Sequence, residues 1–165
     1  DVPVDVVAHP TRHILKARHS AGLVPRVVEH PIAIPKAALE KAMADFADLQ
    51  PLNQRTKSVH GAAWVTGSGA ITVVREDVGR HNALDKLIGA LSVAGVTPTA
   101  RGAGFLLMSS RCSFEIIDKA ARAHIPVILC LSGPTSFALE KAKQANITIY
   151  IRDKIGGVKR LDGTG

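Results

Sequence analysis

The sequence predicts an α/β domain whose mixed, mostly parallel sheet is covered by helices. Continuous apolar runs at residues 104–108, 126–131 and 147–151 are typical of buried strands. They alternate with segments in which apolar residues recur at helical spacing. Alternation of strands and helices is the pattern of a layered α/β domain with parallel strands. Only 4% of the residues are aromatic and 46% are hydrophobic, which predicts a packed aliphatic core.

The first part of the chain predicts only short pieces of structure. Residues 2–8 fit a strand and residues 9–13 a turn. Four histidines lie at irregular spacings without a neighbouring thiol or carboxylate set, so no metal site is predicted there (His9, His13, His19 and His30). The abrupt start at Asp1 suggests a fragment or a shortened protein.

A helix is predicted from Pro35 to about Leu49, because small and apolar residues form one face and Pro35 suits a first turn. Pro51 is expected to close it. Small residues at 61–63 predict a close approach of the backbone to another element. Residues 64–66 and 70–74 flank a Gly-Ser-Gly loop, which predicts a β-hairpin.

Residues 73–89 organise the rest of the chain. An apolar strand leads into Arg75, Glu76 and Asp77, and Gly79 is expected to supply the freedom for a tight strand-to-helix turn. The following helix buries residues at helical spacing and ends before Gly95 and Pro98 (Leu84, Leu87, Ile88 and Leu91). Two further helices are expected to begin within residues 109–115 and 132–136, each directly after an apolar strand.

The three junctions are rich in Gly, Ser, Thr and Arg, and ligands of such sheets bind beyond the carboxyl ends of the strands. Helix N-termini there favour an anion, so the junctions predict a phosphate site. Its candidates are Arg80, His81, Asn82, Ser110, Arg111, Ser132, Thr135 and Ser136. Solvated turns and helix caps are the alternative interpretation, and one hydroxyl can serve both purposes.

The net charge of +7 over 165 residues agrees with an anionic ligand. Basic residues are scattered and no aromatic stacking set accompanies them, so a nucleic-acid partner is not expected. Two cysteines form no disulfide framework, which predicts a reducing, cytoplasmic environment. No apolar run reaches the length of a membrane span and no leader precedes the chain, so no membrane association is expected.

Catalytic candidates are few. Cys112 follows Arg111 at an expected helix start, where a thiol pKa can fall, and His81 is a conceivable base. A buried Cys112 is the alternative, and Cys130 lies within an apolar strand. Glu76 and Asp77 fit either an acid/base pair or structural ion pairs. The junctions lack the His-x-Glu and Pro-Cys-x-x-Cys motifs of zinc deaminases, so no zinc site is expected.

Several segments together resemble the FdhD family, the formate dehydrogenase accessory sulfurtransferases. REDVGRHNALDKLIG at residues 75–89 is similar to the family signature, and VHGAA at 59–63 is similar to its Gly-x-His-Ala-Ala segment. SSRCSFE at 109–115 and SGPTS at 132–136 resemble its next two junctions in the same order. The resemblance extends from about Pro35 to the C-terminus.

The resemblance implies a three-layer α/β/α domain like that of cytidine deaminases, without zinc, over residues 35–165. It implies that residues 1–34 are a remnant of an N-terminal domain and the sulfur-carrying loop. It also implies a dimer that binds the molybdenum bis(molybdopterin guanine dinucleotide) cofactor, with a cysteine desulfurase and formate dehydrogenase as partners. Cofactor contacts are then expected at His60 and in the segment Arg152, Asp153, Lys154, Ile155, Gly156 and Gly157, although that segment lacks the family's aromatic start and closing arginine.

One departure concerns sulfur transfer. The family carries sulfur as a persulfide on a Cys-x-x-Cys loop, and the matching segment here places Ala21 and Val24 at the two cysteine positions. Three interpretations stay open. The chain binds the cofactor, or a guanine nucleotide, without transferring sulfur, or it is an engineered or truncated chain. In the third interpretation, sulfur is transferred through Cys112 instead. A different class, a non-enzymatic guanine-nucleotide-binding regulator, is the alternative to an accessory protein.

Overall fold

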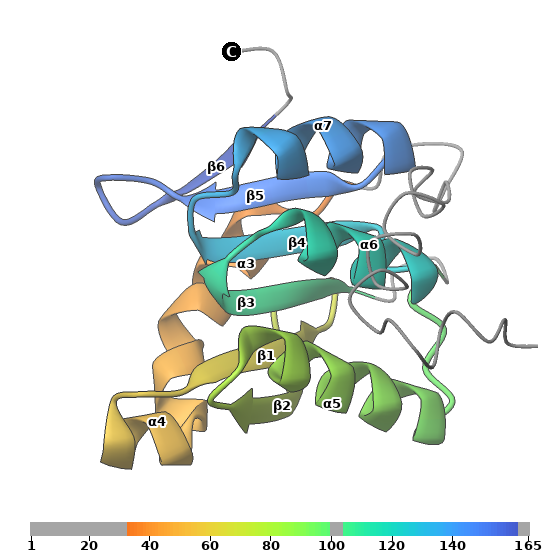
Figure 1. Cartoon of the computed structure of the whole chain (residues 1–165). Helices are drawn as coiled ribbons and strands as arrows, with labels where there is room; N and C mark the ends of the chain where they lie inside the picture. The colour runs from red at the N-terminus through yellow and green to blue at the C-terminus, as the bar shows by residue number, and fades with distance from the viewer. Residues whose placement is uncertain (1–32, 100–103, 162–165) are drawn as a thin grey trace, which may run out of the picture.

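The computed structural model describes residues 33–99 and 104–161 (Figure 1). Its single sheet has the strand order β2-β1-β3-β4-β5-β6. The bounds are His60–Val65 for β1, Ile71–Asp77 for β2, Phe105–Arg111 for β3, Val127–Ser132 for β4, Thr148–Arg152 for β5 and Val158–Leu161 for β6. The β3–β4 and β4–β5 pairs are parallel, and the other three pairs are antiparallel. Four strands, β2 to β5, therefore run in one direction, while β1 and β6 run in the other.

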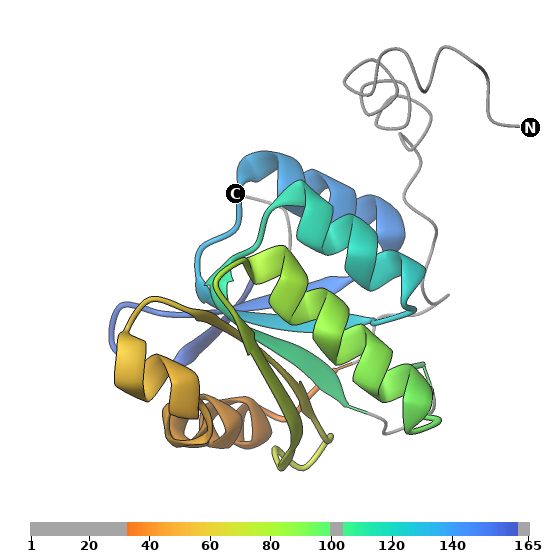
Figure 2. The same cartoon turned by 60° about the horizontal axis from the view of Figure 1, so that its bottom comes forward.

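Helices cover both faces of the sheet (Figure 2). α5 (Arg80–Val93), α6 (Phe114–Arg122) and α7 (Ser136–Ala145) lie on one face. α3 (Lys36–Asp45), the 3₁₀ helix η1 (Phe46–Leu49) and α4 (Pro51–Thr56) lie on the other. The predicted three-layer α/β/α architecture is thereby confirmed.

Two cores follow from the alternation of side chains along the central strands. On β3, Leu106 and Met108 join the core beneath α5, α6 and α7, whereas Phe105 and Leu107 join the core beneath α3 and η1. β4 divides its residues between the two faces in the same way. Successive strand side chains point to opposite faces, so a strand covered on both sides is apolar throughout. This is why the apolar runs predicted these strands.

Other predictions have mixed outcomes. The β1–β2 hairpin is confirmed. Pro51 does not end the preceding helix as expected but begins α4, because proline suits the first helical position. Gly79 has φ −95° and ψ 124°, an extended conformation open to other residues, so the expected reason for a glycine at this turn was wrong. β3 continues through Arg111, so Ser109, Ser110 and Arg111 belong to a strand rather than to a helix start.

None of the helices within residues 33–99 and 104–161 combines the length and the apolar composition that a membrane span requires. The expectations for residues 1–32, including the histidines, Ala21 and Val24, fall outside the described residues. The domain boundary at residue 35 stays a prediction.

Candidate functional site

The candidate site lies along one edge of the sheet, here called the carboxyl edge. At this edge β2, β3, β4 and β5 end, β1 and β6 begin, and α5, α6 and α7 start (Figure 1). His60 arrives there because β1 is antiparallel to its neighbours and pairs His60 with Asp77. With strands about 4.8 Å apart, six strands make an edge roughly 24 Å long. All predicted site residues are brought to this edge, spread along it rather than gathered in one cluster.

The β2–α5 junction is held by Asp77. Its carboxylate accepts from the Gly79 backbone N–H at 2.9 Å, from Asn82 Nδ2 at 3.2 Å and from Lys86 Nζ at 2.5 Å. The Lys86 hydrogen bond, followed by the Gly79 and Asn82 hydrogen bonds, lowers the pKa of Asp77 to about 2. Glu76 instead accepts from the backbone N–H groups of Leu52 and Asn53. Both carboxylates serve the structure, so the acid/base pair is not supported. Asn82, a predicted ligand contact, is engaged with Asp77.

Arg80 and His81, in the first turn of α5, carry buried polar atoms that are not satisfied by the described residues. Arg80 Nε and His81 Nδ1 have no hydrogen-bond partner among them. Burial, and next the positive charge of Arg80, lowers the pKa of His81 below its ordinary value. His81 is therefore favoured as a neutral imidazole near neutral pH. An anionic ligand would supply hydrogen-bond partners for Arg80 Nε and His81 Nδ1 and would offset the positive charge of Arg80.

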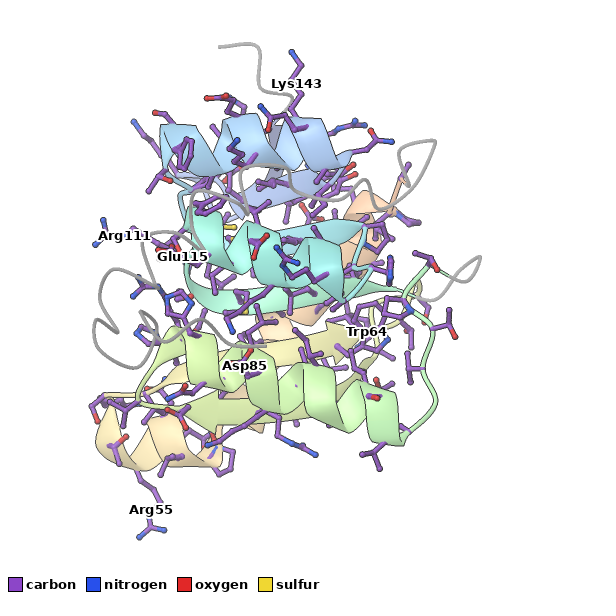
Figure 3. All side chains as sticks on the ribbon, turned by 45° about the vertical axis from the view of Figure 1, so that its right-hand side comes forward. Arg55, Trp64, Asp85, Arg111, Glu115 and Lys143 are labelled. Carbon is purple, nitrogen blue, oxygen red and sulfur yellow. The ribbon has the colours of Figure 1, made fainter. Side chains whose placement is uncertain are left out.

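The neighbouring α6 is fastened to α5 one turn further along. Lys119 Nζ on α6 donates to Asp85 Oδ1 at 2.6 Å and to Oδ2 at 2.9 Å. Figure 3 shows Asp85 on the part of α5 that faces α6, with Glu115 in the first turn of α6. Asp85 and Lys119 thereby fix the spacing of the two helix starts.

At the end of β3, neighbouring residues have different roles. Ser109 Oγ accepts from the Gly61 N–H at 2.8 Å and so joins β3 to β1. Ser110 is buried, with only 4% of its surface exposed, and its hydroxyl donates to the Arg111 carbonyl at 3.3 Å. Ser110 therefore does not face a ligand as predicted. Arg111 is exposed and projects away from the sheet (Figure 3).

Cys112 follows Arg111 and is fully buried in the core beneath α6. Cys130 on β4 is equally buried. The neighbouring Cys112 thiol, and then burial, raises the pKa of Cys130 well above its ordinary value. Burial removes the exposed thiolate that a nucleophile requires, so the structure does not support Cys112 as a nucleophile. The reason lies in β3, which extends to Arg111 and leaves Cys112 packed under the helix.

The β4–α7 junction combines capping with an exposed surface. Thr135 Oγ1 accepts from the Ala138 N–H at 3.1 Å and caps α7. The Thr135 N–H donates to the Cys112 carbonyl at 3.2 Å, which joins this junction to the β3–α6 junction. Ser132 and Ser136 are exposed. Both interpretations left open by the sequence therefore remain compatible with these hydroxyls, and capping is observed for Thr135.

The β5–β6 segment forms a tight turn around Asp153. Asp153 Oδ1 accepts from the N–H groups of Ile155 at 3.0 Å and Gly157 at 2.7 Å. Gly156 has φ +87°, a conformation that glycine adopts without strain. The Asp153 carboxylate thus shapes the turn, while Arg152, Lys154 and Ile155 are exposed on it. The strand that follows, β6, was not predicted.

Sequence reasoning also missed two residues of the edge. Ser113 is the N-cap residue of α6, yet its Oγ is buried without a hydrogen-bond partner in the described parts of the chain. Phe137, 51% exposed, lies 5.0 Å from Phe114 between ring centroids, and Lys141 Nζ lies 5.4 Å from the Phe137 ring. The available signals were a serine before the α6 pattern and an aromatic residue in the first turn of α7.

The edge can bind an anion through arginine, serine and helix N–H groups. Within residues 33–99 and 104–161, no three His, Cys, Asp or Glu side chains form a group that could hold a metal ion, and the absence of a metal from the protein stays a prediction. The arrangement therefore defines a class: an α/β/α protein in which three helix N-termini and the exposed residues Arg111 and Arg152 lie along one edge of the sheet.

Comparison with known proteins shows the family. The FdhD/NarQ family model matches residues 11–155. The chain is 42% identical over 132 residues to a protein of Bordetella parapertussis named sulfur carrier protein FdhD. It is 44% identical over 132 residues to the protein of the same name from Xanthomonas campestris pv. campestris strain B100. The chain belongs to the FdhD/NarQ family, which confirms the resemblance seen in the sequence.

These matches cover 80% and 79% of this chain, but only 45% and 46% of the two relatives. The chain thus spans about half the length of these curated relatives. A crystal structure of a formate dehydrogenase accessory protein from Desulfotalea psychrophila superposes with a TM-score of 0.72 at 24% identity. That match covers 87% of this chain and 59% of the other, and it shows a shared fold.

Proposed function

We propose that this chain is the core part of a formate dehydrogenase accessory protein. Its carboxyl edge would bind the molybdenum bis(molybdopterin guanine dinucleotide) cofactor. Membership of the FdhD/NarQ family supports the accessory role. The observation that carries the ligand proposal is the set of buried, unpartnered atoms at two adjacent helix starts: Arg80 Nε, His81 Nδ1 and Ser113 Oγ. These atoms lack partners among the described residues, and an anion would provide them.

The charge of the residues at the carboxyl edge and the length of that edge both suit a dinucleotide. Arg80 and Arg111 would hold phosphate oxygens by charge-assisted hydrogen bonds, and the starts of α5 and α6 would contribute the positive ends of their dipoles. Exposed Arg152 and Lys154 extend the cationic edge beyond β5. An edge roughly 24 Å long suits an extended ligand better than a single phosphate. The bound cofactor would supply the molybdenum centre that receives sulfur.

The thiols of this chain favour binding without sulfur transfer. The sequence contains two cysteines, and both are fully buried. A persulfide carrier needs a thiol that donor and acceptor can reach. Ala21 and Val24, at the positions of the family's loop cysteines, cannot supply one. A cofactor- or guanine-nucleotide-binding protein that has lost sulfur transfer is therefore the second candidate. Formate dehydrogenase and a second copy of the chain are proposed partners under either candidate, whereas a cysteine desulfurase is a proposed partner only where sulfur transfer is retained.

Titration calorimetry with GDP, a fragment of the cofactor, tests the binding proposal. We expect saturable GDP binding in the micromolar range. ADP, which carries the same phosphates on a different base, is the control ligand. Arg111→Ala should weaken GDP binding by about 1.5–3 kcal/mol, the size of a lost charge-assisted hydrogen bond. Arg122→Ala is the control, since Arg122 lies at the other end of α6 and is exposed. Equal affinity in wild type and both variants would place the ligand elsewhere.

Mass spectrometry separates the two candidate functions. After incubation with a cysteine desulfurase and cysteine, the wild-type chain should gain no sulfur atom. The Ala21→Cys/Val24→Cys double variant should gain a persulfide if the resemblance aligns these positions correctly. A persulfide on Cys112 of the wild-type chain would support sulfur transfer through Cys112 and would contradict the candidate function of binding without sulfur transfer.

A further inference from the structure

β2 ends in two consecutive acidic residues, Glu76 and Asp77, whose carboxylates bind helices on opposite faces of the sheet. Glu76 accepts from the N–H groups of Leu52 at 2.9 Å and Asn53 at 2.8 Å, at the start of α4. Asp77 accepts from Gly79, Asn82 and Lys86, at the start of α5. Successive side chains of a strand point to opposite faces, so each carboxylate serves a different helix.

The hydrogen bonds of Asp77 are made to residues on either side of Arg80 and His81, the two ligand-binding candidates in the first turn of α5. The partners Gly79 and Asn82 lie directly before and after Arg80 and His81 in the chain. Gly79 is the N-cap residue of α5 and has no side chain to cap the helix, so the Asp77 carboxylate holds the junction instead. Val78, at the tip of the turn, is 76% exposed and adds little packing.

Lys86 extends this attachment to the second turn of α5. Its Nζ donates to Asp77 Oδ2 at 2.5 Å and to the Glu76 carbonyl at 3.1 Å. The strand end and the helix are thus joined on both sides of Arg80 and His81. Without the carboxylate, the Gly79 N–H and the Asn82 amide would lose their shared acceptor, and the first turn of α5 could shift.

We infer that Asp77 is a positioning residue for the carboxyl-edge site, because it fixes the junction that directs Arg80 and His81 toward the ligand. This inference rests on the proposed function for the identity of the ligand. Glu76, with the same charge and two hydrogen bonds of similar length, has no such role, because it holds α4 on the opposite face. It is therefore a matched control one residue away.

The test compares Asp77→Ala, Asp77→Asn and Glu76→Gln by GDP titration and by denaturant unfolding. If Arg80 and His81 are displaced, their hydrogen bonds to the anion weaken, so we expect about a tenfold loss of GDP affinity for Asp77→Ala. Asp77→Asn should lose less, because an amide oxygen still accepts from Gly79 while the ion pair with Lys86 is gone. Glu76→Gln should lower stability and leave GDP affinity within about twofold, because the Glu76 carboxylate holds α4 on the opposite face of the sheet.

NMR of the His81 imidazole provides a second readout without ligand. Asp77→Ala should move the His81 resonances, and Glu76→Gln should leave them in place. Unchanged His81 resonances and unchanged GDP affinity in Asp77→Ala would overturn the inference, as would an equal loss of affinity in Glu76→Gln. If wild-type protein binds no GDP, the proposed function fails and the His81 resonances alone decide the inference. If Asp77→Ala does not fold, Asp77→Asn carries the same comparison.

Discussion

Gly61 on β1 lies directly against Gln50, the residue between η1 and α4. A Cβ atom at position 61 would be 2.5 Å from Gln50 Oε1 and 2.9 Å from Phe46 Cζ. Both neighbours are buried, so neither has free space into which to move. The contact explains the small residue predicted at this place: the start of β1 must approach the η1–α4 layer closely.

Gly61→Ala should therefore destabilise the protein by about 1–3 kcal/mol through overpacking. Gly89→Ala is the matched control, because a Cβ there meets nothing within 4 Å and the position is an exposed site in α5. Alanine should stabilise that helix by up to about 1 kcal/mol. Urea unfolding of both variants should give changes of opposite sign. Equal midpoints would contradict the packing at Gly61.

Thr135→Ala should cost about 1 kcal/mol of stability, because the α7 cap at the Ala138 N–H is lost. Thr135→Ser keeps an oxygen at the capping position and should stay near wild type. The same unfolding experiment measures both changes. If the alanine variant is as stable as the serine variant, the Thr135 hydroxyl does not stabilise α7 as a cap.

Stability should also fall on mild acidification because of His81. Its pKa is lowered in the folded protein, first by burial and then by Arg80, so the unfolded chain binds more protons below the ordinary pKa of 6.5. The contribution of His81 is complete above about pH 6.5 and is lost as the pH falls toward its folded pKa. His81→Gln should flatten the dependence of unfolding free energy on pH below about pH 6.5. An unchanged slope would show that His81 titrates alike in both states.

Much of the layered fold could be predicted because its signals are local. The central strands are apolar on both faces and stand out as continuous runs, while α5 and α6 place their buried residues at helical spacing. Gly69 in the hairpin loop has φ +88° and packs against the Ala38 backbone, as a glycine-rich loop suggests. Convergence of the junctions at one edge followed from the parallel order of β3, β4 and β5.

The features that were missed depend on contacts between distant residues. β6 is a short strand with two charged residues, and it exists because the Asp153 turn pairs it with β5. Pro51 is compatible with a helix end or a helix start, and Glu76, more than twenty residues later, stabilises the start. Likewise, no local pattern shows that Cys112 is buried beside Cys130 or that Ser110 faces inward.

Amide NMR mapping of GDP binding tests the central claim most directly, since it reports both affinity and location. With GDP, we expect the perturbed amides to be those of residues 79–82, 111–113 and 132–136, at the starts of α5, α6 and α7. Amides at the other ends of these helices, such as Val93 and Ala145, should stay unchanged and serve as the internal control. Perturbations confined to α3 and α4, or none at millimolar GDP, would contradict a guanine-nucleotide site at the carboxyl edge.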